Sequence, residues 1–170
     1  MIAFANLLEE TLEAWGDARL GIIDEVRNIP ASRWEYRPVS EIRSVKELVV
    51  HILEVAMMMT GELTRADTNF RRAAWPRLLR MYAGPAYQAK TKGDLQRLLK
   101  SQFKDAQKKF RKAGELHMLQ LIERFDGEKG TRLAWLQHGI AQEMYHRGQL
   151  TVYERLMGLE PALTKRISGG

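Results

Sequence analysis

The most informative segment of the sequence is Trp135-Leu-Gln-His-Gly-Ile-Ala-Gln-Glu-Met-Tyr-His-Arg-Gly-Gln-Leu-Thr-Val-Tyr153. At the α-helical step of about 100° per residue, its apolar side chains gather on one stripe that faces a core. The same stripe holds two polar side chains, Gln142 and His146, one helical turn apart. Because buried polar groups are costly unless they are paired or coordinated, the two residues either satisfy each other and a neighbour or face a polar site between helices.

The composition is that of an ordinary globular protein, and we expect residues 1–170 to form a single domain. The absence of cysteine excludes disulfides, thiolate metal ligands and a cysteine nucleophile. The start of the chain lacks the basic residues and cleavage site of a signal peptide, and the most apolar run, residues 48–59, is too short to span a bilayer. We therefore expect a cytoplasmic protein with no membrane partner.

The chain is basic, with a formal net charge of +6, and such a charge can attract nucleic acid or an anionic surface. Four arginines within residues 71–80 also lie near Trp75 and Tyr82, and arginine beside aromatic rings can bind nucleic acid. The same pattern describes a solvated helix face with an aromatic underside, which is the interpretation we favour.

Helical periodicity predicts four long helices and one short helix. The first spans about residues 2–27 and is stopped by Asn28-Ile-Pro30, since proline removes a donor. The second begins at the capping box Ser44-Val-Lys-Glu47 and runs to about Leu63. The short helix is expected within residues 70–81, broken at Gly84-Pro85.

The third long helix is predicted from the N-cap Thr91 to Gly114, and the last from about Thr131 to Met157, ahead of Gly158. The segment that begins at His117 is either extended or helical. With no convincing strand, the pattern predicts an all-α fold, an antiparallel helical bundle. The connection between the second and third long helices is long, so a simple up-down-up-down order does not follow.

His51 lies on the flank of the apolar stripe of the second helix. A lone histidine in such a place is more often a hydrogen-bonded boundary residue than a metal ligand. His117 is expected to be structural or exposed.

Two segments of the sequence resemble the DinB-like family, also called the YfiT-like metal-dependent hydrolases. The first is Ser44-Val-Lys-Glu-Leu-Val-Val-His51, and the second is His146-Arg-Gly-Gln-Leu150 with the residues that follow as far as Pro161. Tyr36-Arg-Pro38 also looks like the family's loop into the second helix. The resemblance covers essentially the whole chain, and its most specific feature is His-Arg-Gly-Gln after an upstream helix that bears a histidine.

The resemblance implies a DinB-like four-helix bundle with an additional short helix, often dimeric, with a divalent metal ion held by three histidines. One histidine comes from the second helix and two come from the last helix, at positions i and i+4. His51 and His146 match this pattern, but Gln142 stands at the third position. His138 does not replace it, because it lies about 12 Å along the helix axis from His146 and about 80° around it, where it can only line the wall or support the ligands.

Gln142 changes the chemistry that the resemblance implies. Gln142-Glu-Met-Tyr-His146 keeps the layout of the zinc-protease motif His-Glu-x-x-His, with the first ligand changed. An amide oxygen is a poorer ligand for zinc or nickel than an imidazole, so the site binds metal more weakly, prefers a harder ion such as manganese or iron, or is lost. Three protein ligands would leave positions open for water or substrate, as in catalytic metal sites.

Glu143 lies about 60° from His146 around the helix, at the edge of the inner stripe, and is the candidate general base. The interpretation that we favour is a solvated or salt-bridged glutamate, for example one that pairs with Arg147. Arg147 and Gln149 are expected to be polar partners of the site and the bundle. Tyr153 either directs its hydroxyl toward the site or packs in the core with one hydrogen bond.

Three functions remain open from the sequence. The first is a metal-dependent enzyme, which would be either a hydrolase or a transferase. In the transferase, the metal would hold a low-molecular-weight thiol for attack on a small electrophile. The resemblance implies family members of both kinds. The second is a non-catalytic bundle with a degenerate metal site, in which His51, Gln142 and His146 form a satisfied polar network. The third, ranked last, is nucleic-acid binding through the basic faces. A homodimer is expected from the resemblance alone.

Overall fold

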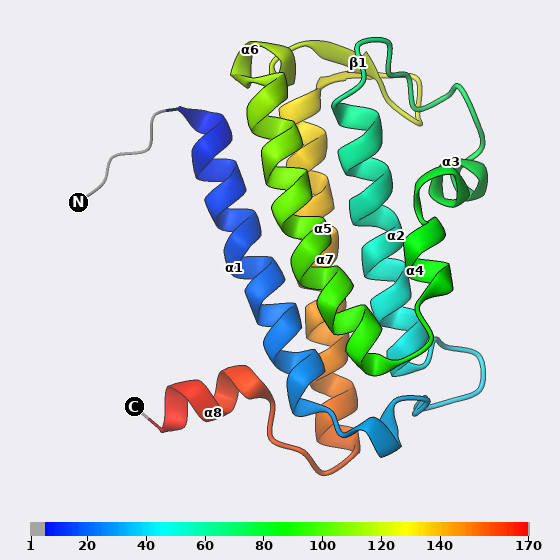
Figure 1. The fold of residues 1–170 in the computed structure, drawn as a ribbon, viewed down its shortest axis with the longest axis vertical. Helices are drawn as coiled ribbons and strands as arrows, with labels where there is room; N and C mark the ends of the chain where they lie inside the picture. Colours follow the sequence, from blue (N-terminus) through cyan, green and yellow to red (C-terminus); the bar gives the residue numbers. More distant parts are fainter. Residues whose placement is uncertain (1–5, 170) are drawn as a thin grey trace.

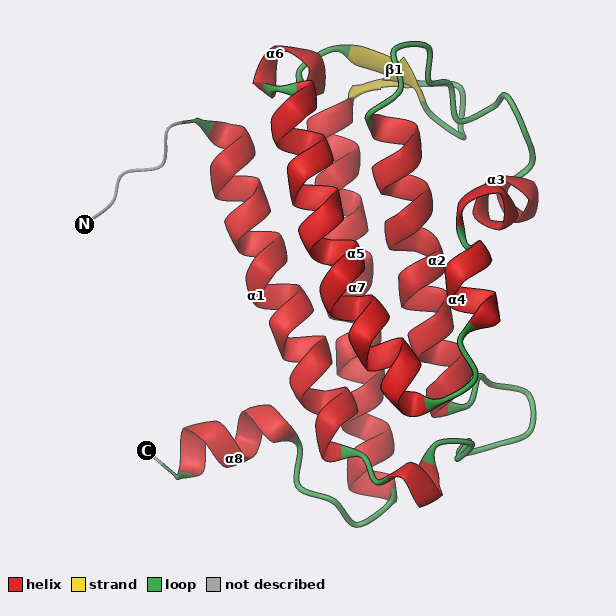
Figure 2. Ribbon diagram, in the orientation of Figure 1, coloured by secondary structure: helices red, strands yellow, loops and turns green. Residues whose placement is uncertain are grey.

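Four long helices pack side by side in the computed structural model, which describes residues 6–169 (Figures 1 and 2). They are α1 (Leu7–Asn28), α2 (Val45–Leu63), α5 (Lys92–Ala113) and α7 (Arg132–Leu156). In Figure 1, α1 and α7 run downward whereas α2 and α5 run upward. Helices α1 and α2 each pack against both α5 and α7. The predicted all-α bundle is confirmed, with the order down-up-up-down.

The capping residues explain where the long helices begin. The Ser44 hydroxyl accepts the Glu47 amide at 3.2 Å and the Glu47 carboxylate accepts the Ser44 amide at 2.7 Å, so the predicted capping box is present. Thr91 and Asp94 form a second box at the start of α5, and Thr131 caps α7. Three of the predicted starts are thus confirmed.

Asn6 caps α1, and residues 2–5 of the first predicted helix lie outside the described residues. Gly114 and Gly158 follow α5 and α7 with φ angles of 81° and 75°. Only glycine adopts such angles without strain, which confirms the predicted ends of both helices. After Gly158, a short helix α8 (Ala162–Ser168) packs against α1.

A long connection returns the chain from the end of α2 to the start of α5 (Figure 1). It contains α3 (Trp75–Tyr82) and α4 (Gly84–Gln88). The predicted short helix exists but begins later than expected, because Pro76 suits the first turn of a helix. The predicted break at Gly84-Pro85 is confirmed, since α3 ends at Tyr82, and a separate helix α4 begins there with Pro85 in its first turn.

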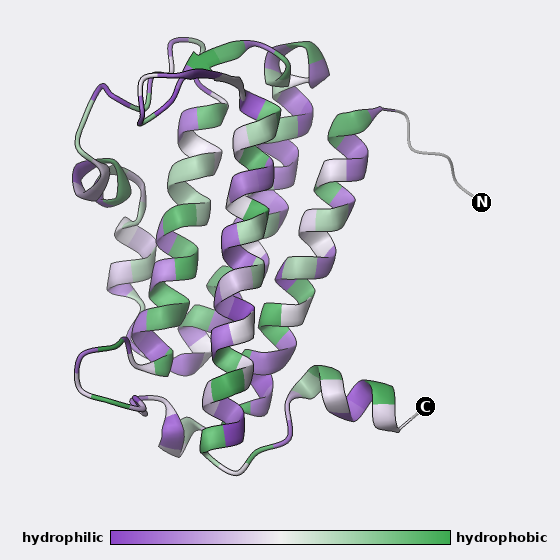
Figure 3. Cartoon of the chain, turned by 180° about the vertical axis from the view of Figure 1, so that it is seen from behind, coloured by the Kyte–Doolittle hydropathy of each residue, from purple (hydrophilic) through white to green (hydrophobic). Residues whose placement is uncertain are grey.

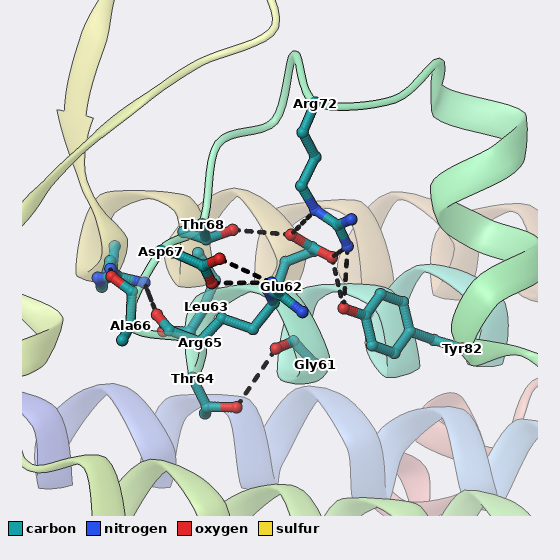
Figure 4. A network of polar contacts seen from close by, with 11 residues as sticks. Gly61, Glu62, Leu63, Thr64, Arg65, Ala66, Asp67, Thr68, Arg72 and Tyr82 are labelled. Carbon is teal, nitrogen blue, oxygen red and sulfur yellow. Dashed lines mark hydrogen bonds and ion pairs between the residues drawn. The ribbon is translucent and has the colours of Figure 1, made fainter.

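The buried carboxylate of Glu62, near the end of α2, anchors this connection (Figure 4). It accepts hydrogen bonds from the Thr68 hydroxyl at 2.8 Å and from the Tyr82 hydroxyl, and it pairs with the Arg72 guanidinium. Burial alone would raise the pKa of Glu62, but the bonds from Arg72, Tyr82 and Thr68 outweigh it and hold the pKa below its usual value. This network fixes α3, and with it Trp75, beside α2.

A short antiparallel hairpin joins α5 to α7. Strand β1 (Leu121–Glu123) pairs with β2 (Lys129–Thr131), and Gly127 adopts a φ of 88° in the turn between them. The expectation of no strand was wrong here, because strands of three residues are too short to show an alternating pattern.

The short helix α6 (Glu115–Met118) precedes this hairpin and contains His117. The His117 Nε2 atom lies 2.9 Å from the carbonyl oxygen of Leu63, the last residue of α2. His117 therefore binds a carbonyl group that is left free at the C-terminus of α2. This is the structural role, one of the two roles that we expected for His117.

The core is divided into two apolar clusters along the length of the bundle. Leu12 of α1 and Leu136 of α7 belong to one cluster, and Ile22 and Leu150 to the other. Polar residues occupy the level between them, including the buried residues Arg19, Gln102, Glu143 and His146. Seen from behind, hydrophilic and hydrophobic residues alternate along the long helices, as in amphipathic helices (Figure 3). Within residues 6–169, no helix is both long and apolar enough to span a membrane.

Candidate functional site

Helices α2 and α7 bring His51 and His146 together at the polar level of the bundle. The centroids of the two rings lie 5.1 Å apart, and the ring planes meet at 82°. His146 is 6% exposed, and His51 is half-buried. The two histidines that the resemblance selects, 95 residues apart in the sequence, are therefore neighbours in the fold.

Each histidine is oriented by the residue three positions further along its own helix. The His51 Nδ1 atom lies 3.1 Å from Glu54 Oε2, and the His146 Nδ1 atom lies 2.6 Å from Gln149 Oε1. Because these oxygens accept hydrogen bonds, Nδ1 carries a proton in both rings, and Nε2 is the nitrogen that is left to bind an ion. Metal-binding histidines are commonly held in this way. Sequence reasoning missed Glu54, although its i+3 spacing from His51 was visible.

Gln142 lies one turn before His146 and lines the same pocket. Its Oε1 and Nε2 atoms are both buried, and neither has a hydrogen-bond partner among the described residues. A buried amide in this condition costs about 1–3 kcal/mol unless a ligand or an ion binds it.

A pocket with a volume of about 330 Å³ opens beside these three side chains. Its size suits a small molecule, and most of its wall is apolar. Trp75 reaches it from α3, so the crossover connection completes a site that α2 and α7 begin. The lining residues other than His51, Gln142 and His146 are Val55, Met59, Trp75, Trp135, His138, Gly139 and Tyr145.

His138 lies in this wall, as expected. The centroid of its ring is 4.8 Å from that of Trp135. Within the part of the chain that the structure describes, no three histidine, cysteine, aspartate or glutamate side chains are placed to bind one metal ion. A metal site at His51 and His146 therefore depends on the amide oxygen of Gln142.

Glu143 faces α1 and does not line the pocket. Its carboxylate accepts hydrogen bonds from Trp15 Nε1 at 2.8 Å and from Arg19 Nε at 2.9 Å, and it pairs with a second nitrogen of Arg19. Arg19 also donates to Gln102 Oε1 at 2.8 Å. The carboxylate suggested as a general base is thus the acceptor of a closed, buried ion pair, in line with the salt-bridged interpretation that we favoured, with Arg19 in place of the expected Arg147.

Two other polar residues of α7 hold the bundle together. Arg147 lies over Gly21, where the absence of a side chain leaves room for the guanidinium, and its Nη2 atom is 3.5 Å from Glu25 Oε1. The Tyr153 hydroxyl donates to the carbonyl oxygen of Arg43 at 3.0 Å. Arg147 thus fixes α7 to α1, and Tyr153 fixes the loop that precedes α2.

Burial sets the charge of the site. It lowers the pKa of His146; the hydrogen bond to Gln149 opposes this change, and the charges of His51 and Arg43 add to it. The imidazole is therefore neutral at pH 7. Burial would raise the pKa of Glu54, but its contacts with His51 and Tyr87 outweigh this effect and lower the pKa, so Glu54 remains an ionised acceptor.

The sequence profile of the DinB family matches residues 1–167. No curated protein matches the sequence.

Three solved structures share the fold. A DinB-like protein of Bacillus subtilis, YjoA, is 24% identical with a TM-score of 0.65, over 88% of this chain and 92% of that one. A protein from Exiguobacterium sibiricum assigned to the DinB family is 21% identical with a TM-score of 0.67, over 92% and 95% of the two chains. A mycothiol-dependent maleylpyruvate isomerase is 14% identical with a TM-score of 0.65, and the match covers 88% of this chain but 63% of that one.

Proposed function

This chain belongs to the DinB family, and on that basis we propose that it is a metal-dependent enzyme that transfers a low-molecular-weight thiol to a small electrophile. The observation that carries the proposal is the buried amide of Gln142, which has no hydrogen-bond partner among the described residues. It lies in one pocket with His51 and His146, whose Nδ1 atoms are occupied by Glu54 and Gln149, so that Nε2 is left to bind an ion.

The donor set fits a divalent cation. Two imidazole nitrogens and an amide oxygen would come from His51, His146 and Gln142, a mixture that zinc, nickel, manganese and iron all accept. Because one ligand is an amide, we expect weaker binding than at a site of three imidazoles and a preference shifted toward manganese or iron. When bound, the ion supplies a positive charge that makes a neighbouring thiol or water more acidic.

The chain's own residues orient the ligands and exclude water. Glu54 and Gln149 hold the two imidazoles in one tautomer, so that both Nε2 atoms stay available. Trp75, Trp135 and Tyr145 supply an aromatic wall against which a small electrophile can lose its water.

The pocket favours thiol transfer over hydrolysis. Its lining contains no aspartate or glutamate among the described residues, and Glu143 is committed to Arg19. The pKa of water lies far above that of a thiol, which is near 8.5, so water depends more on a general base to lose its proton. The mycothiol-dependent maleylpyruvate isomerase, which shares the fold, supports a thiol as co-substrate. From that enzyme we take only the class of co-substrate, a low-molecular-weight thiol.

We also propose that two copies of the chain associate through the outer face of α7. Met144, Val152 and Leu156 are 47%, 51% and 59% exposed. Among the described residues, no atom beyond the neighbouring backbone of α7 lies within 4 Å of the position of a side chain at Gly148. These residues recur every four positions and form one apolar stripe, a feature typical of interfaces. Light scattering should give the mass of a dimer for the wild type and of a monomer for Val152→Lys; a monomeric wild type would contradict this proposal.

The function is tested with tag-free protein loaded with manganese, iron, zinc or nickel. Cysteine and 1-chloro-2,4-dinitrobenzene serve as the thiol and the electrophile, and conjugation is followed by absorbance. We expect a metal-dependent rate that falls about 100-fold or more in His146→Ala. Folded protein that neither takes up metal nor accelerates conjugation would contradict the proposal and leave a non-catalytic bundle. Hydrolysis that needs metal but no thiol would replace the transferase by a hydrolase.

A further inference from the structure

We call the pocket of about 330 Å³ that Trp75, Trp135 and Tyr145 line the aromatic pocket. A second hollow, of about 460 Å³, adjoins it, and His51 lines both of them. Its walls come from the loop before α2 and the first turns of that helix. Arg43 lines this hollow and also a third one of about 510 Å³, where it meets Gln149 and Tyr153 of α7. Arg43 therefore lies beside both α2 and α7, near the residues that orient the two histidines.

Two of the three basic residues in the second hollow are already paired with carboxylates. The Arg37 guanidinium lies 3.0 Å from Glu47, and the Lys46 ammonium lies 2.9 Å from Glu35. Their charges are thus largely offset within the protein itself.

The third basic residue, Arg43, is different. Among residues 6–169, no carboxylate lies within ion-pairing distance of its guanidinium, and the guanidinium donates no hydrogen bond to the protein. The two remaining acidic residues of the hollow have other donors, since Glu54 accepts from His51 at 3.1 Å and Glu41 accepts from Ser40 at 2.5 Å. Arg43 is therefore the basic group of this hollow that is available to a ligand.

The backbone of Arg43 is held in place although its side chain is exposed. Its carbonyl oxygen accepts the Tyr153 hydroxyl at 3.0 Å, and the next residue, Ser44, is the buried N-cap of α2. Its positive charge acts on Glu54 of α2 and on His146 of α7. A guanidinium on a fixed backbone suits the bidentate binding of a carboxylate.

We propose that Arg43 binds the carboxylate of a small substrate whose apolar body occupies the aromatic pocket on the other side of His51. The substrate class is an apolar carboxylic acid, aryl or alkyl. That this acid is the electrophile rests on the proposed function, whereas the binding of a carboxylate by Arg43 requires no metal.

The test uses phenylacetate and phenylacetamide, which share an apolar body and differ in the charged group. Their affinities for the full-length protein are measured by calorimetry at low ionic strength, with chelator and with saturating zinc. We expect wild-type protein to bind phenylacetate about tenfold more tightly than phenylacetamide, and Arg43→Met to lose this preference. Arg33→Met is the matched control, since Arg33 is exposed, has no carboxylate partner among the described residues and lines none of these hollows.

Equal or undetectable affinities in the wild type would overturn the inference, as would a preference that survives in Arg43→Met. If Arg33→Met also lost the preference for phenylacetate, the preference would come from the net charge of the protein. If the preference appeared only with zinc, it would come from the metal ion. Either result would overturn the role of Arg43. A preference that requires Arg43 in chelator supports the inference even if the protein takes up no metal. In that case only the proposed enzymatic function fails.

Discussion

Gln142 and Glu143 are neighbours in the sequence, yet they belong to two different polar clusters. In the closed cluster, around Glu143, the polar atoms are hydrogen-bonded; in the open cluster, around Gln142, some of them are not. Toward α1, the Glu143 carboxylate is satisfied by Trp15 and Arg19. Toward α2, both polar atoms of Gln142 are buried beside His51 and His146, and neither has a partner in residues 6–169. The two clusters share one helix and one level of the bundle.

The difference between the two clusters indicates that neighbouring residues of α7 have different roles, one in stability and one in function. Consecutive residues of a helix point about 100° apart, so α7 directs one polar side chain to each of its neighbours. A network in which every buried group is paired stabilises the fold, whereas a network with unpaired groups carries a cost that a ligand can remove. We therefore propose that the closed cluster stabilises the bundle and that the open cluster binds the metal ion.

The largest expected effect concerns the closed cluster. Glu143→Gln leaves the buried guanidinium of Arg19 without its counter-charge, which should lower the free energy of unfolding by about 3–5 kcal/mol. Gln142→Met, the matched control in the open cluster, removes an amide that has no partner and should change stability by less than about 1 kcal/mol or raise it. Urea denaturation measures both variants. Equal losses in the two would contradict the distinction between the clusters.

A third polar residue of α7 lies between these two cases. Glu154 is fully buried; its Oε1 atom accepts from Asn28 at 2.6 Å, but its Oε2 atom has no partner among the described residues. Burial raises the pKa of Glu154 to about 7, with a further contribution from Glu25. In the unfolded chain the pKa returns to about 4.5, so between these values the folded state holds more protons and stability falls as pH rises.

At about 1.4 kcal/mol per pH unit, this loss amounts to about 3 kcal/mol and is complete above pH 7. Glu154→Gln cannot lose the proton, so it should gain up to that amount relative to the wild type between pH 5 and pH 8. Urea denaturation of both proteins at several pH values gives the difference directly. A difference that does not vary with pH would show that Glu154 is ionised in the folded protein at all of these pH values.

The smallest expected effect concerns the open cluster. Gln142→His replaces the amide with an imidazole at the same spacing from His146, and should tighten zinc binding about 10- to 100-fold, or about 1.4–2.7 kcal/mol. Competition with a chromogenic chelator measures the change. Unaltered zinc affinity would mean that residue 142 does not reach the ion.

Much of the fold could be predicted from the sequence because its signals are local. Ser44 with Glu47, Thr91 with Asp94, and Gly158 each fix a helix end within a few residues of chain. The hairpin could not be predicted, because strands of three residues show no period.

The site could be predicted only in part, because its geometry depends on partners far apart in the sequence. The sequence placed Glu143 at the edge of the inner stripe, from which its side chain could contact either of the two neighbouring helices. Its partner Arg19 lies 124 residues earlier. A signal was present, since Arg19 continues the apolar stripe of Trp15 and Ile22 on α1 and a lone arginine there needs a buried partner. Arg43, a single arginine in a loop, gave no such signal.

We propose that His51, Gln142 and His146 hold a metal ion despite the glutamine. The most direct test is the metal content and affinity of protein purified without a histidine tag, for the wild type and for His146→Ala. We predict one bound ion per chain in the wild type and none in the variant. No uptake of zinc, nickel, manganese or iron at micromolar concentrations by folded wild-type protein, or equal uptake by His146→Ala, would contradict the account.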